Sequence, residues 1–185
     1  QLGTVSYEAH VAAYLDTVKP PVLSYDHYAL MEWGDRPEYF ENLEIIRRQA
    51  LRAGVPFWNV VLSTPHFAYR DPSPADLRWQ AYTTLAYGGK GLVYFTYLTP
   101  DVENYREGIV SIYGKPTTKY AAVQQVNLEL QRLGPHLLTL TSTRVAHWPD
   151  APQGATVLDG AGLVTKIEGG AFVVGELADE AGDAW

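Results

Sequence analysis

Residues 54–62 read Gly-Val-Pro-Phe-Trp-Asn-Val-Val-Leu, and this stretch indicates how the chain is built. Gly54 suits the position that ends a helix, because glycine adopts the left-handed conformation found there at no steric cost. The apolar run 57–62 then predicts a short buried strand. The connection before this strand is short, whereas a long segment rich in proline, histidine and tyrosine follows it at 63–74.

The same alternation extends on both sides of this stretch. Apolar residues at helical spacing predict helices, and short apolar runs predict two further strands at 21–25 and 91–97. Strands separated by helices are expected to pair in parallel through right-handed crossovers. The predicted helices cover residues 6–18, 37–53, 75–87 and 116–133, the last of them ended by Gly134-Pro135.

The predicted fold class is therefore α/β, with about three βα units and parallel strands in residues 1–140. Short loops before the strands and long loops after them are typical of (β/α) barrels, whose active sites lie at the carboxyl ends of the strands. Three strands cannot close a barrel, so we expect a partial barrel that is a fragment or that pairs with another chain. A doubly wound open sheet, which binds ligands at the same strand ends, is the alternative.

The pattern changes after residue 140. Short segments at 143–148, 156–159, 163–168 and 172–176 predict strands, because glycine-containing turns separate several of them. We therefore expect a small antiparallel β unit over residues 141–185. We interpret it as a truncated β-rich domain whose next strand would follow Trp185.

The composition excludes several classes of protein. The 185 residues include 46% hydrophobic and 19% charged residues and have a formal net charge of −7. An acidic chain repels the phosphate backbone, so we expect no nucleic-acid partner. No apolar run approaches the ~18 residues of a membrane helix, and the N-terminus does not resemble a signal peptide, so we expect no membrane partner. The absence of cysteine excludes disulfides and thiolate metal sites.

Aromatic residues are abundant, with 13 Tyr and 5 Trp against 5 Phe. Tyrosine and tryptophan combine an apolar face with a polar edge. Such side chains suit sugar rings, which carry apolar C–H faces rimmed by hydroxyls, and they suit the core of a large α/β protein equally well.

Three stretches of the predicted barrel segment resemble a known family. Leu-Ser-Tyr-Asp-His-Tyr at 23–28, Pro-Phe-Trp-Asn at 56–59, and the Leu-Arg-Trp-Gln-Ala-Tyr and Gly-Leu-Val-Tyr-Phe motifs within 77–97 are similar to the last three βα units of β-galactosidase-like glycoside hydrolases of the clan A type. Residues 127–135 resemble the final helix of that (β/α)8 barrel, which a β-rich domain commonly follows. The resemblance covers about residues 1–140 and implies hydrolysis of β-linked sugars.

The chain departs from the family at the position of the catalytic nucleophile. Retaining members carry a glutamate at the end of the seventh strand, where this chain reads Phe57 to Ser63 without any carboxylate. The acid/base glutamate of the family belongs to the fourth strand, which would precede Gln1. Glycoside cleavage needs two carboxyl groups flanking the bond, so we expect the catalytic pair to be incomplete within this chain.

Asp26 and His27 follow the first predicted strand, where a barrel places its functional groups. Asp26 is the candidate catalytic carboxylate, or alternatively a residue that caps a turn or pairs with Arg36. His27 is a candidate for binding substrate, against the alternative of a structural histidine.

The other candidate substrate-binding residues follow or lie within the second and third strands. Asn59 needs partners if buried, and a ligand hydroxyl is one of them, while core packing is expected for Trp58 on the opposite face. His66 lies in the following loop, and Ser63 lacks the surroundings of a hydrolytic nucleophile. The remaining two candidates, which could form an aromatic platform, are Tyr94 and Tyr97.

We expect neither a metal nor a cofactor. The five histidines are scattered without the spacing of a zinc site, and no glycine-rich phosphate loop follows a strand. Glu32, Asp35, Glu103 and Glu107 lie in the long loops and could supply a carboxylate, although surface charge is the more usual role of such residues.

Three functional hypotheses follow. The first is a glycoside hydrolase acting on β-linked sugars, with one carboxyl group supplied from elsewhere. The second is a non-catalytic carbohydrate-binding or assembly module that keeps the aromatic cleft. The third is an open-sheet α/β domain of unrelated function. The first two predict a carbohydrate ligand and, because free sheet edges tend to pair, a second copy of the chain or a complementary barrel segment.

Overall fold

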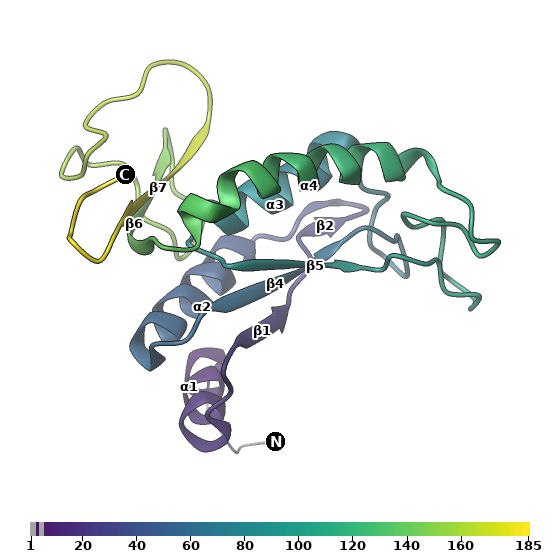
Figure 1. Cartoon of the computed structure of the whole chain (residues 1–185), viewed down its shortest axis with the longest axis horizontal. Coiled ribbons are helices and arrows are strands. Elements are labelled where there is room, and N and C mark those ends of the chain that lie inside the picture. Colours follow the sequence, from purple (N-terminus) through teal and green to yellow (C-terminus); the bar gives the residue numbers. More distant parts are fainter. Residues whose placement is uncertain (1–2, 4–5) are drawn as a thin grey trace.

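The computed structural model describes residue 3 and residues 6–185 as an α/β protein (Figure 1). Its elements follow one another as α1 (Tyr7–Val18), β1 (Leu23–Asp26), β2 (Leu30–Met31), β3 (Gly34–Asp35), α2 (Tyr39–Ala53), β4 (Phe57–Leu62), α3 (Pro74–Ala86), β5 (Gly91–Phe95), α4 (Thr118–Leu137), β6 (Thr141–Trp148) and β7 (Phe172–Ala178). The four expected helices and three expected parallel strands are confirmed.

The central sheet has the order β1-β4-β5, and both of its strand pairs are parallel. Strands that follow one another along the chain are thus neighbours in the sheet. Two separate antiparallel pairs of strands are also present: β2 pairs with β3, and β6 pairs with β7.

The helices cover one face of this sheet. In Figure 1, α2, α3 and α4 lie on one side of β1, β4 and β5, and no element lies across the other side. Burial alternates accordingly, since Leu23, Tyr25 and Phe57 are buried whereas Ser24 and Trp58 are exposed. We call the uncovered side the bare face, which carries Ser24, Asp26, Trp58, Val60, Leu62, Gly91, Val93 and Phe95.

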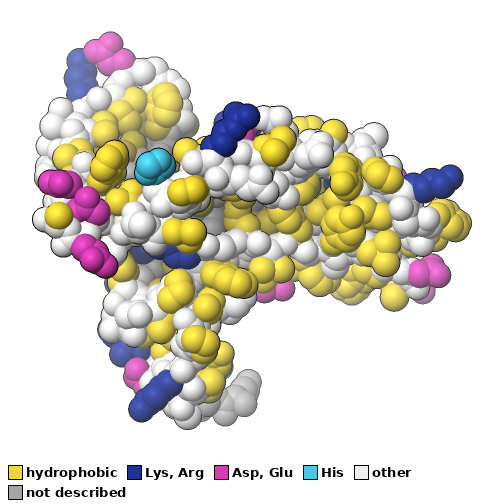
Figure 2. Space-filling view, in the orientation of Figure 1, with side chains coloured by type: hydrophobic (Ala, Val, Ile, Leu, Met, Phe, Trp, Pro, Cys, Tyr) yellow, Lys and Arg dark blue, Asp and Glu magenta, His cyan; other side chains and the backbone are white. Residues whose placement is uncertain are grey.

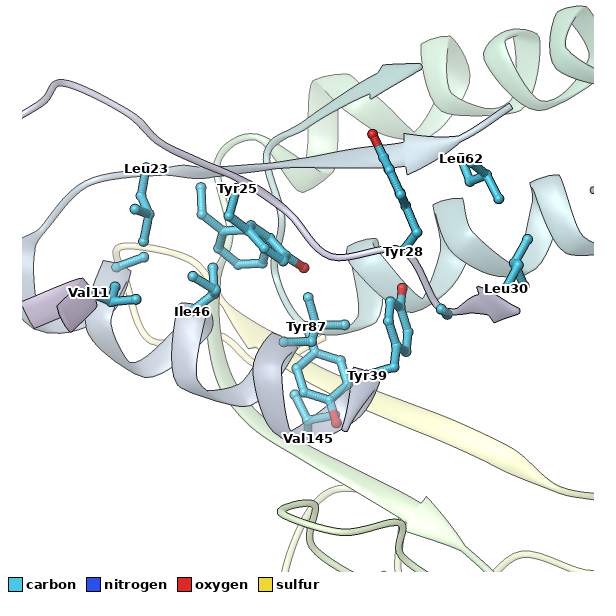
Figure 3. Close-up of a cluster of buried hydrophobic side chains, with 14 of the residues drawn as sticks. Val11, Leu23, Tyr25, Tyr28, Leu30, Tyr39, Ile46, Leu62, Tyr87 and Val145 are labelled. Atoms are coloured by element: carbon cyan, nitrogen blue, oxygen red, sulfur yellow. The ribbon is translucent and has the colours of Figure 1, made fainter. Parts of the chain in front are cut away.

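The main core lies between the sheet and the helices. Figure 3 shows Leu23 and Tyr25 of β1 directed towards Ile46 of α2, with Tyr39 and Tyr87 further along the same core. Apolar residues at helical spacing along α1 and α2 face inward here, which accounts for their helical pattern in the sequence.

The last helix continues beyond its expected end. We expected Gly134-Pro135 to stop it, but α4 includes both residues and extends to Leu137. Proline removes one amide donor from the helix, and the residue whose carbonyl would accept that hydrogen bond, Gln131, is exposed to solvent. Water can therefore replace the missing bond.

The C-terminal region forms a smaller β unit than expected. β6 and β7 confirm the first and last predicted strands, but no strand forms at 156–159 or 163–168, where a single bridge joins Val157 to His147. β6 and β7 pair with each other in antiparallel fashion, so the two intervening segments do not pair with them as strands. The β6–β7 pair packs against α3. Gly175 makes this approach possible, because a Cβ there would lie 2.0 Å from the carbonyl oxygen of Ala86.

Candidate functional site

The carboxyl ends of β1, β4 and β5 lie at one edge of the sheet, and three long loops leave from them. The loop after β4 is anchored to β5, because the amides of Ser63 and Thr64 both donate to the carbonyl of Phe95 at 2.9 Å. The Thr64 hydroxyl also bonds the carbonyl oxygen of Thr96 at 3.2 Å. The three loops therefore start from a common, well-defined edge.

The same loops are joined to one another further out. The backbone amide of Glu32 donates to the carbonyl of Ala68 at 2.9 Å, and that of Arg106 donates to Pro65 at 2.9 Å. The Arg106 guanidinium pairs with Glu32 at 3.3 Å and donates to the carbonyl of Tyr69 at 2.8 Å. Arg106 thus links all three loops through side-chain and main-chain contacts.

Aromatic rings fill the space between these loops, in a group we call the carboxyl-end cluster. Tyr28 packs edge-on against His66 and Tyr69, with ring centroids 5.8 and 5.1 Å apart. His66 stacks on Tyr105 at 5.0 Å with nearly parallel planes, and Phe95 contacts Tyr28 and His66. The cluster consists of Tyr28, His66, Tyr69, Phe95 and Tyr105, contributed by all three loops and β5.

Asp26 lies on the bare face beside this cluster. Its Oδ2 accepts a hydrogen bond from the Tyr28 hydroxyl at 3.1 Å, and the carboxylate is otherwise exposed. Burial raises the pKa of Tyr28, and the charge of Asp26 raises it further. Tyr28 therefore keeps its proton and holds the Asp26 carboxylate against the rings. Our sequence reasoning missed Tyr28 as a site residue, although its position two residues after Asp26 is the spacing of a shared strand face.

The two candidate histidines differ in their surroundings. His66 is buried, and its Nδ1 donates to the carbonyl of Thr64 at 2.8 Å, which fixes the ring within the cluster. His27 is half-buried, and its Nε2 is enclosed without a hydrogen-bond partner in the described part of the chain. Burial lowers the pKa of His27, and the nearby charge of Arg36 lowers it further, so this imidazole is neutral at neutral pH.

Asn59 and Tyr94 lie on the helix-covered face, away from Asp26. The Asn59 amide nitrogen donates to the Thr84 hydroxyl at 2.8 Å, and the Tyr94 hydroxyl donates to Oδ1 of Asn127 at 3.0 Å. Burial raises the pKa of Tyr94 to about 12. Both residues therefore have protein partners among the helices that cover the sheet.

The expectation that Trp58 packs in the core is wrong. Trp58 lies on the bare face with 42% of its surface exposed, and its indole covers Gly91 of the neighbouring strand. A Cβ at Gly91 would lie 2.6 Å from the ring, so glycine is required for this packing. Asn59 occupies the buried side instead, where its amide nitrogen donates to Thr84 and its Oδ1 has no hydrogen-bond partner among the described residues.

Exposed aromatic residues continue beyond the cluster. Tyr97 and Phe67 stand out from the loops after β5 and β4. Figure 2 shows hydrophobic side chains gathered along the arm of the molecule that contains β5 and the loop after it. Two exposed rings, those of Tyr97 and Phe67, therefore continue outward from the carboxyl edge of the sheet.

Carboxylates that could act with Asp26 are not gathered around it. Glu32 pairs with Arg106 and Asp35 with Arg70, while Glu103 and Glu107 are exposed in the loop after β5. Within residues 6–185, no three histidine, aspartate or glutamate side chains form a group that could hold a metal ion. In this part of the chain, no helix is both long and apolar enough to cross a bilayer.

A separate cavity of about 590 Å³ lies at the opposite, amino-terminal end of the strands. Its two cationic side chains are already engaged: Arg47 pairs with Glu44 at 2.7 Å, and Lys90 donates to the carbonyls of Leu137 and Leu140 at the end of α4. Burial lowers the pKa of Lys90. We therefore centre the candidate site on Asp26, where parallel α/β folds bind their ligands.

Comparisons with protein-family models and with the curated proteins find no match to this chain.

Proposed function

We propose that this chain is a glycoside-hydrolase-like protein whose parallel sheet corresponds to about three βα units of a (β/α) barrel. The observation that supports this most is the winding of the sheet. Consecutive parallel strands are neighbours in the order β1-β4-β5, and their helices all lie on one face. A barrel has this arrangement with helices outside, whereas a doubly wound sheet carries helices on both faces.

The proposed ligand is a chain of β-linked sugars bound along the bare face, from Trp58 near the amino end of β4 to the carboxyl edge. Trp58, Tyr97 and Phe67 are the exposed rings on which an apolar sugar face would pack. Asp26 would accept hydrogen bonds from sugar hydroxyls, and charge-assisted bonds of this kind are the strong ones. The formal net charge of −7 favours a neutral ligand over an anionic one, because a negatively charged chain repels anions.

In the hydrolytic form of the proposal, Asp26 is one of the two carboxyl groups that flank the scissile bond. One group protonates the leaving oxygen, and the other attacks the anomeric carbon or activates water, through an oxocarbenium-like transition state. Tyr28 would orient Asp26 through its 3.1 Å hydrogen bond. The second carboxyl group would come from a complementary barrel segment that covers the bare face.

A non-catalytic carbohydrate-binding role is the second candidate, and one observation favours it. Asp26 is the sole carboxylate among the described strand residues on the bare face, where the register places Ser24, Trp58, Val60, Leu62, Gly91, Val93 and Phe95 with it. A single carboxylate can bind a sugar hydroxyl but cannot supply both roles of the reaction.

Hydrolysis of a panel of aryl β-glycosides, together with binding of the same sugars, tests both candidates. We expect sugar binding that weakens in Trp58→Ala and Asp26→Asn. Release of the aryl group that disappears in Asp26→Asn would establish the hydrolytic form with the site complete in this chain or its oligomer. Binding without hydrolysis would establish the binding role, and the absence of both from the folded chain would reject the proposal.

A further inference from the structure

A second aromatic groove lies away from the bare face, where α2 and α3 meet the β6–β7 unit. It has a volume of about 400 Å³, within the range of small-molecule sites. Its walls come from three parts of the chain that are distant in sequence. They include Phe40 of α2, Trp79 and Tyr82 of α3, and Trp148 and Phe172 of the β unit.

Core packing explains only some of these rings. Phe40 contacts Trp79 at 5.8 Å and His147 at 4.6 Å, so it joins the β unit to the helices. Phe172 is 46% exposed, and Trp148 is only partly buried, although both lie at the groove. The β6–β7 unit thus keeps two large rings at an open surface, where they lose the full benefit of burial.

Polar groups surround these rings. Asp150 lines the groove, and its carboxylate has no hydrogen bond or ion pair to any described residue. Tyr82 also lines the groove, and its hydroxyl donates to Glu129 of α4 at 2.8 Å. The groove therefore combines an aromatic floor with an unpaired acceptor and a hydrogen-bonded polar edge.

We propose that this groove is a second saccharide-binding site, separate from the one on the bare face. A pyranose ring presents an apolar C–H face to Trp148 and Phe172 while its hydroxyls donate to the Asp150 carboxylate. A purely apolar occupant would bury that carboxylate without a partner, which is costly, and an anion would be repelled by it. The inference rests on the proposed function only for the class of ligand, since its geometry involves different residues.

Side-chain NMR of the whole chain tests the proposal, with the indole N–H signals of Trp58, Trp79 and Trp148 assigned by substitution. Cellotetraose and β-1,4-galactotetraose serve as probes up to about 10 mM, which reaches the range of weak binding. We expect the Trp148 signal to shift with at least one probe, also when Asp26→Asn and Trp58→Ala disable the bare-face site.

Variants of the groove complete the test. Asp150→Asn keeps the shape of the side chain and should weaken binding at Trp148 about tenfold, as expected for losing a hydrogen bond to a charged group. Phe172→Ala should do the same, with near-UV circular dichroism confirming the fold. Glu180→Gln, an exposed carboxylate elsewhere in the β unit, is the matched control and should bind as the original chain does.

The outcomes separate this site from the proposed function. A Trp148 response that survives loss of the bare-face site and weakens about tenfold in Asp150→Asn supports the second site, whether or not aryl glycosides are hydrolysed. A Trp148 signal that moves with neither probe, or binding that is unchanged in both groove variants, overturns it.

Discussion

The two faces of the β1-β4-β5 sheet share the same three strands but differ in what they hold. On the helix-covered face Phe57 and Leu23 are buried, and the polar Asn59 has a protein partner. On the bare face Trp58 and Val93 are 42% and 39% exposed beside an ionisable side chain, Asp26. The helix-covered face is therefore part of the hydrophobic core, whereas the bare face is a surface available to a ligand or a partner.

Adjacent substitutions on β4 test this contrast with the largest expected effect. Phe57→Ala should lower the free energy of unfolding by about 3–5 kcal/mol, because it empties a buried site. Trp58→Ala, one residue further along, should cost about 1 kcal/mol, since much of the indole is already in water. Urea unfolding at matched protein concentrations measures both. Equal losses in the two variants would show that the bare face is covered in solution.

Gln80 provides the next test, on the helix-covered face. Its side chain accepts from the amide of Leu62 at 2.8 Å and donates to the carbonyl of the same residue at 3.0 Å. Gln80→Met would leave both backbone groups buried without these partners, at about 1–3 kcal/mol for each. The exposed Gln124→Met on α4 is the control and should stay within about 0.5 kcal/mol. A neutral Gln80→Met would mean that the end of β4 is hydrated.

The junction with the β unit should show a smaller, pH-dependent effect. His147 is buried, its Nε2 lies 2.8 Å from the Tyr87 hydroxyl, and burial lowers its pKa from 6.5. The folded chain then binds fewer protons at this residue than the unfolded chain, so its stabilising contribution is complete above pH 6.5 and is lost as the pH falls below that value.

Thermal unfolding between about pH 7 and pH 5 measures this contribution. His147→Gln keeps a polar partner for Tyr87 but cannot titrate, and its melting temperature should fall less on acidification than that of the original chain. Parallel pH profiles for the two proteins would contradict the assignment. The comparison of the two proteins also cancels the contribution of His27, whose pKa burial lowers in both.

The smallest effect concerns the ion pair that joins α3 to α4 on the outer surface. The hydrogen bond from Arg78 lowers the pKa of Glu129 from 4.5 to about 2. Glu129→Gln should therefore lower the melting temperature slightly above pH 4.5, with the difference disappearing as the pH falls towards about 2. Glu103→Gln, an exposed glutamate in the loop after β5, should show no such difference.

Local patterns were sufficient to predict most elements, and the misassignments have identifiable causes. Both ends of the predicted strand over 57–62 are confirmed by β4. A short apolar run between a helix-ending glycine and a polar loop is typical of a buried strand. Pro135 misled the prediction of α4, since solvent exposure of the preceding turn decides whether a helix tolerates proline. Because successive side chains of a strand point to opposite faces, the sequence correctly places Trp58 and Asn59 on different faces of the sheet. It does not determine which of the two faces the helices cover.

Part of the candidate site could also be predicted from the sequence. Asp26 and His66 could be located because strand ends in parallel α/β folds carry function. Tyr105 could not, because it lies in the loop after β5 and meets His66 only once that loop folds against the loop after β4. The Trp148–Phe172 groove likewise depends on how the β unit packs against α3.

The amino-acid sequence by itself determined the succession of helices and parallel strands, since periodicity, caps and turn residues act over a few positions along the chain. Only the tertiary structure decided that the helices gather on one face. That choice exposes Trp58, buries Asn59 and brings Asp26 beside the aromatic cluster. The physical reason is that strand pairing and helix packing are contacts between distant residues, whose free energies depend on the whole arrangement and not on any local pattern.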